Sequence, residues 1–240
     1  PGTIGAITWL ARNPAVIPRI AGGLAISHHR DAGPPTYKCS RRGDSAMDRA
    51  AQREVRDRGG STREFIPYGY DERQYCAPGF NLPIGLLSRT PWGEFPEYHT
   101  SADNPDFVTA DALADSLETL LEILARVEAA GPTPPDRPRP GRGAADAEAY
   151  LNLAPYGEPQ LGRRGLYSAI GGATDGKEAE LAMLWMLSLS DGDHTMVEIA
   201  RRSGMPATAL ATAATRLQAA DLIVPLAEAP PDAWPDSPSG

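Results

Sequence analysis

The stretch GEFPEYHTSADNPDF, residues 93–107, contains His99 directly after Tyr98, followed by two hydroxyl side chains and Asp103. The 240-residue chain has only four histidines. A neutral imidazole can hold Zn²⁺, and a zinc ion with an open coordination position makes its bound water nucleophilic near neutral pH. A histidine in a loop rich in proline and aromatic residues can also be hydrogen-bonded for purely structural reasons. The residue types alone therefore leave two interpretations of His99, a metal ligand or a structural residue.

Asp31, in SHHRDAGPP, follows a strand-like run and comes directly after His28, His29 and Arg30. A carboxylate at the end of a strand could be a metal ligand, and the two histidines could assist it. Asp is also a frequent turn residue, and here it begins an Ala-Gly-Pro-Pro turn. The histidine pair could equally form a polar rim. Both roles of Asp31 stay open.

Two adjacent acids, Asp71 and Glu72, precede Arg73 in the aromatic-rich stretch GYDERQYC. If one carboxylate were buried near His99, its pKa would rise and it could transfer protons during catalysis. The alternative is a solvated turn in which the acids face Arg73. Arg41, in CSRRGD, and its neighbour at position 42 could bind a substrate carboxylate through paired hydrogen bonds, or could lie exposed where a helix begins.

The composition restricts the class of protein. The chain is 41% hydrophobic and 22% charged, which is typical of a globular protein with a buried core. A net charge of −8 gives no general attraction to nucleic acid or to an anionic membrane, so neither is an expected partner. Apolar runs such as LAMLWMLSLS are too short to span a bilayer, and no signal-peptide pattern is present. Cys39 and Cys76 do not make a disulfide framework or indicate a thiol nucleophile, and we expect a cytoplasmic protein.

The elements that must position these residues follow from hydrophobic periodicity. Apolar residues at spacings of three and four predict a helix over 109–130, with Thr109 as its N-cap and Gly131 at its end. A second helix is predicted over 44–58. The short apolar runs GGLAISHH, REFIPY and FNLPIGLL are of strand length. Helices interleaved with such strands predict an α/β layer domain over residues 1–130.

Residues 131–147, GPTPPDRPRPGRGAADA, contain five prolines and three glycines and predict a linker. Beyond it, helices are predicted over 176–192, 195–204 and 206–220, with a turn at Gly204-Met205-Pro206 and a strand at 221–226. This order predicts a winged helix-turn-helix domain over 148–228 and a flexible tail over 229–240.

The motifs together resemble the zinc aminopeptidases. YHTSADN is similar to that family's Tyr-His-Thr-x-x-Asp motif, and YDERQYCAPGFNLP resembles the stretch that precedes a Gly-containing strand. With YKCSRRGDSAMDRAA, EPQLGRRGLY and LAMLWMLSLSDG, they look like uncharacterised bacterial aminopeptidase-like proteins that end in a winged helix. The resemblance implies a three-layer α/β/α fold, of which residues 1–130 would be the C-terminal part.

The resemblance also implies roles for individual residues. His99 and Asp31 would be zinc ligands, and Thr100 and Asp103 would hold the ring and its loop. Glu72 would be the candidate catalytic acid or base. Asp71, Arg73 and Tyr98 would bind substrate at the wall of the pocket.

One position departs from the family. Its Glu-Glu pair, one ligand and one general base, is replaced here by Gly2 and Thr3. Two ligands cannot hold zinc tightly. Because the sequence begins without methionine, we expect it to be the C-terminal part of a longer protein. The expected function is an aminopeptidase-like metallohydrolase acting on a peptide or an amino-acid amide. The alternative is a non-catalytic or repurposed scaffold whose winged helix mediates assembly. We expect a homo-oligomer, or association with a missing N-terminal portion.

The winged helix itself has the wrong charge for DNA. Residues 148–226 contain nine acids and six bases, and the would-be recognition helix ATALATAATRLQAA has a single base, Arg216. DNA binding requires several Lys or Arg contacts to phosphate. The domain is therefore predicted to pack against protein.

Overall fold

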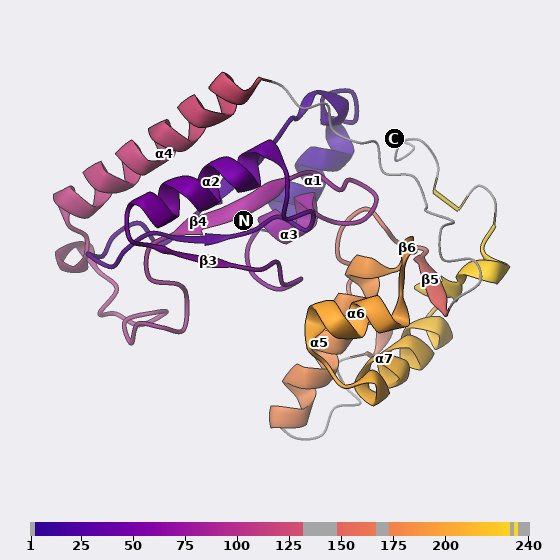
Figure 1. The fold of residues 1–240 in the computed structure, drawn as a ribbon. Helices are drawn as coiled ribbons and strands as arrows, with labels where there is room; N and C mark the ends of the chain where they lie inside the picture. Colours follow the sequence, from indigo (N-terminus) through magenta and orange to yellow (C-terminus); the bar gives the residue numbers. More distant parts are fainter. Residues whose placement is uncertain (1–2, 132–147, 167–172, 231–232, 235–240) are drawn as a thin grey trace.

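The structure is a computed structural model that describes residues 3–131, 148–166, 173–230 and 233–234. Two α/β domains lie side by side, and the N-terminal one is built on a four-stranded sheet (Figure 1). In chain order its elements are α1 (Ile4–Arg12), β1 (Gly23–Ile26), β2 (Thr36–Lys38), α2 (Ala46–Asp57), β3 (Ser61–Arg63), α3 (Glu72–Tyr75), β4 (Ile84–Ser88) and α4 (Ala110–Ala130). No helix in the described part of the chain is long and apolar enough to cross a membrane.

The sheet has the strand order β1-β4-β2-β3, with β1 parallel to β4, β2 antiparallel to β4, and β3 parallel to β2. Successive side chains of a strand point to opposite faces. Leu87 of β4 therefore packs under α2 and α4, while Ile84 packs with Leu10 of α1 on the opposite face. Gly85 faces the side of α2, where the ring of Tyr37 leaves no room for a Cβ atom. The result is a layered α/β domain, as the sequence predicts.

The two long helices of this domain are both capped at their N-termini. In α2, Ser45 and Asp48 form a capping box, and the apolar residues of the helix are buried. In α4, the side chain of Thr109 accepts a hydrogen bond from Ala112 N. The apolar face of α4 differs from expectation, because four of its leucines are exposed and its buried face includes Ser116 and Ile123 instead.

The C-terminal domain is a winged helix. Its elements are β5 (Ala149–Asn152), α5 (Ala173–Leu189), β6 (Asp191–Thr195), α6 (Met196–Ser203), α7 (Ala207–Ala219) and β7 (Ile223–Pro225). The strands form an antiparallel sheet of order β6-β5-β7. Gly204 ends α6 in a left-handed conformation, as predicted, and β7 lies within the predicted strand. The helices share one apolar core around Trp185, Met186 and Leu210.

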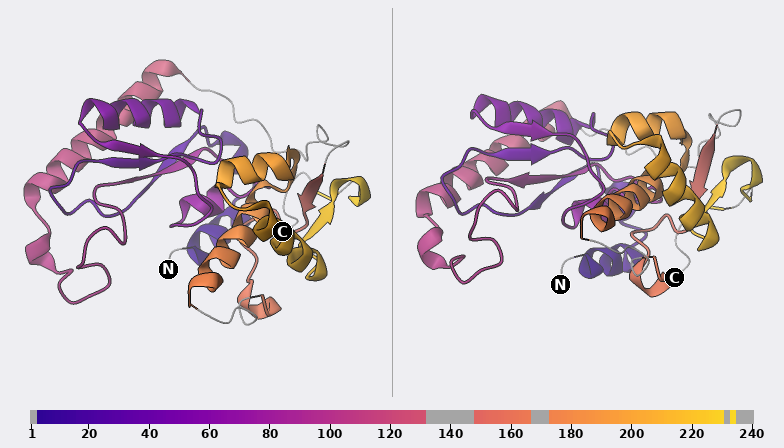
Figure 2. Two further views of the ribbon diagram at one scale, coloured as in Figure 1. Left: turned by 60° about the horizontal axis from the view of Figure 1, so that its bottom comes forward. Right: turned by 90° about the horizontal axis from the view of Figure 1, so that it is seen from below.

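The two domains lie side by side (Figure 2), and they are joined by packing and by ionic contacts. Phe65 and Cys76 of the N-terminal domain belong to the core of the winged helix, and the Phe65 ring meets Trp185 with 6.1 Å between ring centres. Arg41 forms an ion pair with Asp191 and donates from Nε to the Ser188 carbonyl at 2.9 Å. The winged helix thus packs against its own chain.

Three local predictions need correction or qualification. The run REFIPY at 63–68 is not a strand beyond Arg63, because β3 comes earlier and Phe65 leaves the sheet for the other domain's core. Residues 132–147 of the predicted linker lie outside the described residues. The predicted flexible tail is anchored at Trp234, which is buried and donates from its indole Nε1 to the Asn152 carbonyl at 2.8 Å.

Candidate functional site

Because β1 and β4 are parallel, their carboxyl ends lie at the same end of the sheet. The loops that follow these two strands contain the predicted site residues. The loop after β1 contains Asp31, and the loop after β4 contains Tyr98 and His99. In open α/β sheets, ligands bind outside the carboxyl ends of the strands. The topology therefore brings the two predicted metal ligands to the same end of the domain.

Asp31 is held in a defined orientation. Its Oδ1 accepts hydrogen bonds from Gly33 N at 2.8 Å and from Thr90 Oγ1 at 2.7 Å, so the loops after β1 and β4 meet at this carboxylate. A Cβ on residue 33 would lie 2.6 Å from Thr90 Oγ1 and 2.7 Å from Asp31 Oδ1, which explains the glycine. The other oxygen, Oδ2, is buried and has no hydrogen-bond partner among the described residues.

A buried carboxylate oxygen without a partner is uncommon, since buried polar atoms are almost always hydrogen-bonded. A carboxylate is also one of the groups that can ligate a divalent metal. The neighbouring histidines have the same feature. The Nδ1 atoms of His28 and His29 are buried without a partner in the described chain, while His29 Nε2 lies 2.9 Å from the Leu87 carbonyl. The donor types at this edge therefore fit a divalent metal.

Around His28 the structure assembles an aromatic cluster. Its Nε2 is 2.6 Å from the hydroxyl of Tyr70, which is 3.5 Å from the hydroxyl of Tyr98. The rings of Tyr70, Phe95 and Tyr98 all lie 5.3 to 5.4 Å from the His28 ring. Burial, and then the charge of Arg30, lowers the pKa of His28 and favours a neutral imidazole, while burial raises the pKa of Tyr70 and keeps its hydroxyl protonated.

His99 lies at the exposed side of this cluster. Its ring stacks on Tyr98 with 3.9 Å between centres, and its backbone has a positive φ of 59°. Thr100 Oγ1 donates to the Glu97 carbonyl at 2.8 Å, and Asp103 forms an ion pair with Arg30 at 2.7 Å. Both residues therefore shape the loop, and neither is bonded to the imidazole.

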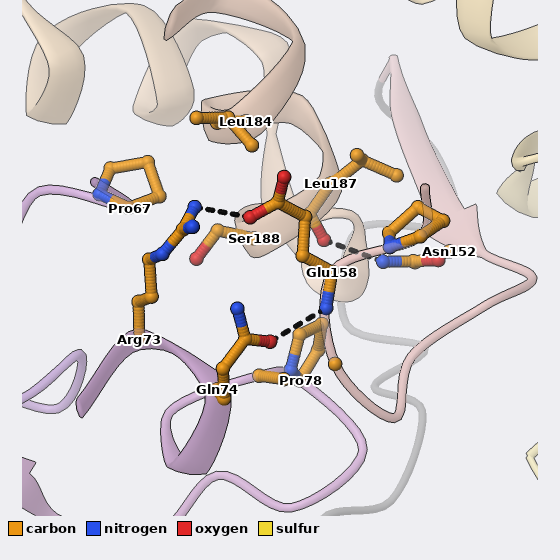
Figure 3. A pocket seen from close by; sticks show the side chains of 12 residues that line it. Pro67, Arg73, Gln74, Pro78, Asn152, Glu158, Leu184, Leu187 and Ser188 are labelled. Carbon is orange, nitrogen blue, oxygen red and sulfur yellow. Dashed lines mark hydrogen bonds and ion pairs between the residues drawn. The ribbon is translucent and has the colours of Figure 1, made fainter. Parts of the chain in front are cut away.

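The three adjacent residues predicted at the pocket wall face three different places. The carboxylate of Glu72 is fully buried, pairs with Lys38 Nζ at 2.5 Å and accepts from Tyr70 N at 3.1 and 3.2 Å. Asp71 accepts a hydrogen bond from Thr3 N, and Arg73 pairs with Glu158 of the winged helix beside a small interdomain pocket (Figure 3). Each side chain therefore joins two segments of the chain, and Glu72 is not among the residues that line the cavity beside His28.

A cavity of about 380 Å³ opens on the face of the sheet opposite α2. His28 and Tyr70 line one side of it, Lys38 lies on its floor, and Tyr68 and Trp92 pack together at 5.5 Å on another side. It is the size of a cavity for a small ligand. The aromatic cluster therefore separates this cavity from the exposed ring of His99.

Sequence reasoning missed Tyr70, Thr90 and Lys38. Thr90 and Tyr70 come from loops, and only the fold brings them to Asp31 and His28. A lysine within the three-residue strand β2 was the one available signal, since a buried lysine requires an acidic partner.

No group of three or more His, Cys, Asp or Glu in the described part of the chain is arranged to hold a metal ion. Gly2, at the position of the family's glutamate pair, lies outside the described residues, and Thr3 follows it at the start of α1. The described residues therefore do not complete a metal site around the two candidate ligands, Asp31 and His99.

Comparison with known sequence families settles the relationship of the N-terminal domain. Residues 1–130, more than half of the chain, match the family described as "Domain of unknown function (DUF4910)". The chain belongs to this family. Residues 148–225 match a winged helix-turn-helix family, in agreement with the observed C-terminal domain.

Two relatives of this DUF4910 member come from Clostridium acetobutylicum. A protein named "Putative polysaccharide biosynthesis protein with aminopeptidase-like domain" is 40% identical over 225 residues, which are 93% of this chain and 48% of the relative. A crystal structure named as that of a "putative peptidase" matches with a TM-score of 0.52 and 36% identity, over 94% of this chain and 47% of that one. The chain therefore has a peptidase-like fold and spans about half the length of both relatives.

Proposed function

We propose that this chain forms part of an aminopeptidase-like metallohydrolase that acts on a peptide or an amino-acid amide, with Asp31 and His99 as ligands of a zinc ion. The observation that carries the proposal is the buried Oδ2 of Asp31, which has no partner among the described residues, on a carboxylate whose other oxygen is held by Gly33 and Thr90. The names of the two relatives agree with this class of reaction.

The site requires more ligands than these two, because two protein ligands hold zinc weakly. The described residues contain no third ligand in position. In this proposal the remaining ligands and the general base come from outside the 240 residues, in a part of the protein to which the relatives' other half corresponds.

The residues of this chain would bind and orient the substrate. When bound, zinc would supply a nucleophilic water near neutral pH. The cavity beside His28 would receive the side chain of the substrate, and the Tyr70 ring would form part of its wall. A neutral His28 would accept the hydrogen bond of Tyr70 and fix its position.

We do not propose nucleic acid as a partner of the winged helix. The one base of α7, Arg216, donates to the Leu166 carbonyl at 2.7 Å, and Arg202 of α6 donates to the Arg41 carbonyl at 2.8 Å. Bases that are engaged within the chain are not available to contact phosphates.

A second candidate is a non-catalytic scaffold of the same fold. It is favoured by the buried ion pair of Glu72 with Lys38, which engages the carboxylate that the sequence predicts as the catalytic acid or base. Metal content and peptidase activity, measured together, separate this candidate from the first.

The test is elemental analysis of the longest protein that the gene encodes, with the Asp31→Ala and His99→Ala variants and with Asp106→Asn as control. Asp106 is an exposed acid in the loop of His99. We expect stoichiometric zinc in the parent and the control, and loss from both variants. Unchanged zinc in both variants would remove Asp31 and His99 as ligands. Metal lost from both without any peptidase activity in the parent would favour the scaffold.

A further inference from the structure

The two edges of the N-terminal sheet differ in chemistry. At one edge, β3 has the sequence Ser-Thr-Arg, and its Arg63 pairs with Glu94 at 2.7 Å. At the other edge, β1 has the sequence Gly-Leu-Ala-Ile, and Ile26 is 54% exposed. Charged residues on an edge strand discourage further pairing, and an apolar edge without them invites it. Only the β1 edge has the character of a strand that continues into a neighbour.

The backbone of β1 identifies the groups that are available. Gly23 N donates to the Pro83 carbonyl at 3.2 Å and Ser27 N to the Leu87 carbonyl at 3.1 Å, so these alternate residues face β4. Leu24 and Ile26, between them, therefore direct their N–H and C=O groups toward the open edge. A groove of about 460 Å³ runs along this strand, and Trp9 and Ile20 form its other wall.

The outer side of α4 has a second apolar surface, which is exposed among the described residues. Leu113, Leu117, Leu121 and Leu124 recur at four, four and three residues and lie on one face, and each is 41 to 57% exposed. We call this face the α4 leucine stripe.

The α4 leucine stripe points away from α2. The opposite side of α4 contacts α2 through Asp115, which pairs with Arg58 at 2.8 Å, and through Arg126, which pairs with Glu54 at 2.8 Å. Beneath α4, Val127 and Leu24 of β1 pack against the same core cluster. The α4 leucine stripe therefore lies on the β1 side of the helix, and Figure 1 shows α4 beside α2 at the end of the molecule far from the winged helix.

We propose that the β1 edge and the α4 leucine stripe together bind one β-strand and one amphipathic helix, supplied by the part of the protein that this chain does not span. Both relatives are about twice as long as the matched region, so a polypeptide of similar size is available to cover the surface. A strand would pair with the free groups of Leu24 and Ile26, and the helix would cover the leucines.

The charge of α4 predicts the chemistry of that helix. Its 21 residues contain five acids and a single base, Arg126, which is already paired with α2. A second copy of α4 would bring like charges together, whereas a helix with Lys or Arg beside its apolar face would be complementary. The occupant is therefore a basic-flanked segment of the remaining protein. The inference does not depend on metal binding or on hydrolysis.

Hydrogen exchange on the longest protein that the gene encodes tests this surface, with Thr62 as an internal reference. Thr62 lies in the exposed edge strand β3, between two residues that face β2, so its amide is directed outward. We expect the Leu24 and Ile26 amides to exchange at least about 100-fold more slowly than Thr62, because they are paired. The double variant Leu117→Glu, Leu121→Glu should lose this protection, whereas Val197→Glu, at an exposed apolar position of α6, should keep it.

Each other outcome contradicts the proposal. Rapid exchange at Leu24 and Ile26 in the parent would show that nothing pairs with β1. Protection that rises with protein concentration, together with a doubled mass in solution, would assign the surface to a second copy. Protection that survives the double leucine variant would separate the strand from the helix surface and remove the joint site.

Discussion

The molecule brings an aspartate together with histidine in two regions, and the two regions differ in how completely the carboxylate is bonded. At the domain boundary, Asp191 accepts from His194 Nδ1 at 2.8 Å and from the backbone of Asp193 at 3.1 Å, and it pairs with Arg41. At the end of β1, Asp31 has one oxygen bonded and one buried without a partner among the described residues. The first arrangement is complete without a ligand, and the second is not.

This difference shows that residue types alone do not distinguish a structural Asp–His cluster from a candidate ligand-binding site. The number of hydrogen bonds that the carboxylate accepts does distinguish them. Burial alone would raise the pKa of Asp191, but the hydrogen bond from His194 and the charge of Arg41 lower it to about 2. Burial and the charge of Arg41 also lower the pKa of Arg202, which lies 3.2 Å from His194 Nε2. Such a saturated cluster holds two domains together.

Arg41→Ala should destabilise the protein by about 3–5 kcal/mol, because it leaves the buried carboxylate of Asp191 without its cationic partner. Urea denaturation measures the loss. Arg53→Ala is the control, since Arg53 is largely exposed on α2 and should change stability by less than about 1 kcal/mol. A loss below 1 kcal/mol for Arg41→Ala would mean that the interdomain cluster contributes little.

The pH dependence of stability should include a term from Asp191. Its pKa is about 2 in the folded chain and 3.8 ordinarily, so the unfolded chain binds the proton first as the pH falls. The contribution, about 2.5 kcal/mol, is complete above about pH 4 and is lost as the pH falls toward 2. Urea denaturation between pH 5.5 and 2.5 should show a shallower slope for Asp191→Asn than for the parent. Equal slopes would contradict the low pKa.

Gly33→Ala should cost about 1–3 kcal/mol, because its Cβ would overlap Thr90 Oγ1 and Asp31 Oδ1. It should also misplace the Asp31 carboxylate and reduce any bound zinc in the longest gene product. Gly5→Ala is the matched control, since no atom lies within 4 Å of its Cβ position and alanine favours a helix. Thermal unfolding and elemental analysis together give the result, and an unaffected Gly33→Ala would show that the two loops adjust freely.

Tyr70→Phe should cost about 1 kcal/mol, the net value of one hydrogen bond, by removing the contact with His28 Nε2 while keeping the ring. An NMR titration should show a changed pKa for His28, and Tyr68→Phe, whose ring lies at the cavity, serves as control. A His28 titration identical in Tyr70→Phe and parent would place the hydroxyl away from the imidazole.

Much of the fold follows from the sequence, because the signals concerned are local. The Ser45–Asp48 capping box begins α2, Gly204 ends α6, and short apolar runs of strand length form β1 and β4. Capping, glycine conformation and hydrophobic periodicity act over a few residues and are therefore visible without a fold. The change of composition at residue 131 marks the domain boundary for the same reason.

The candidate site could be predicted only in part. The motif around His99 and the position of Asp31 placed the two residues in loops that the topology brings to one edge of the sheet. The roles of Glu72 and Arg73 could not be foreseen, because adjacent residues of one helical turn point in different directions. Glu72 forms an ion pair with Lys38, which comes from a strand distant in the sequence. Arg73 forms an ion pair with Glu158, which comes from the other domain.

The sequence by itself therefore determined the α/β and winged-helix classes of the two domains, their order, the long helices and the acidic character of the whole chain, since these depend on local propensity and composition. Only the tertiary structure decided which carboxylates are satisfied, which leucines of α4 stay exposed and which edge of the sheet is open. The physical reason is that burial and hydrogen bonding depend on partners tens of residues away, as with Thr90 at Asp31 and Arg41 at Asp191.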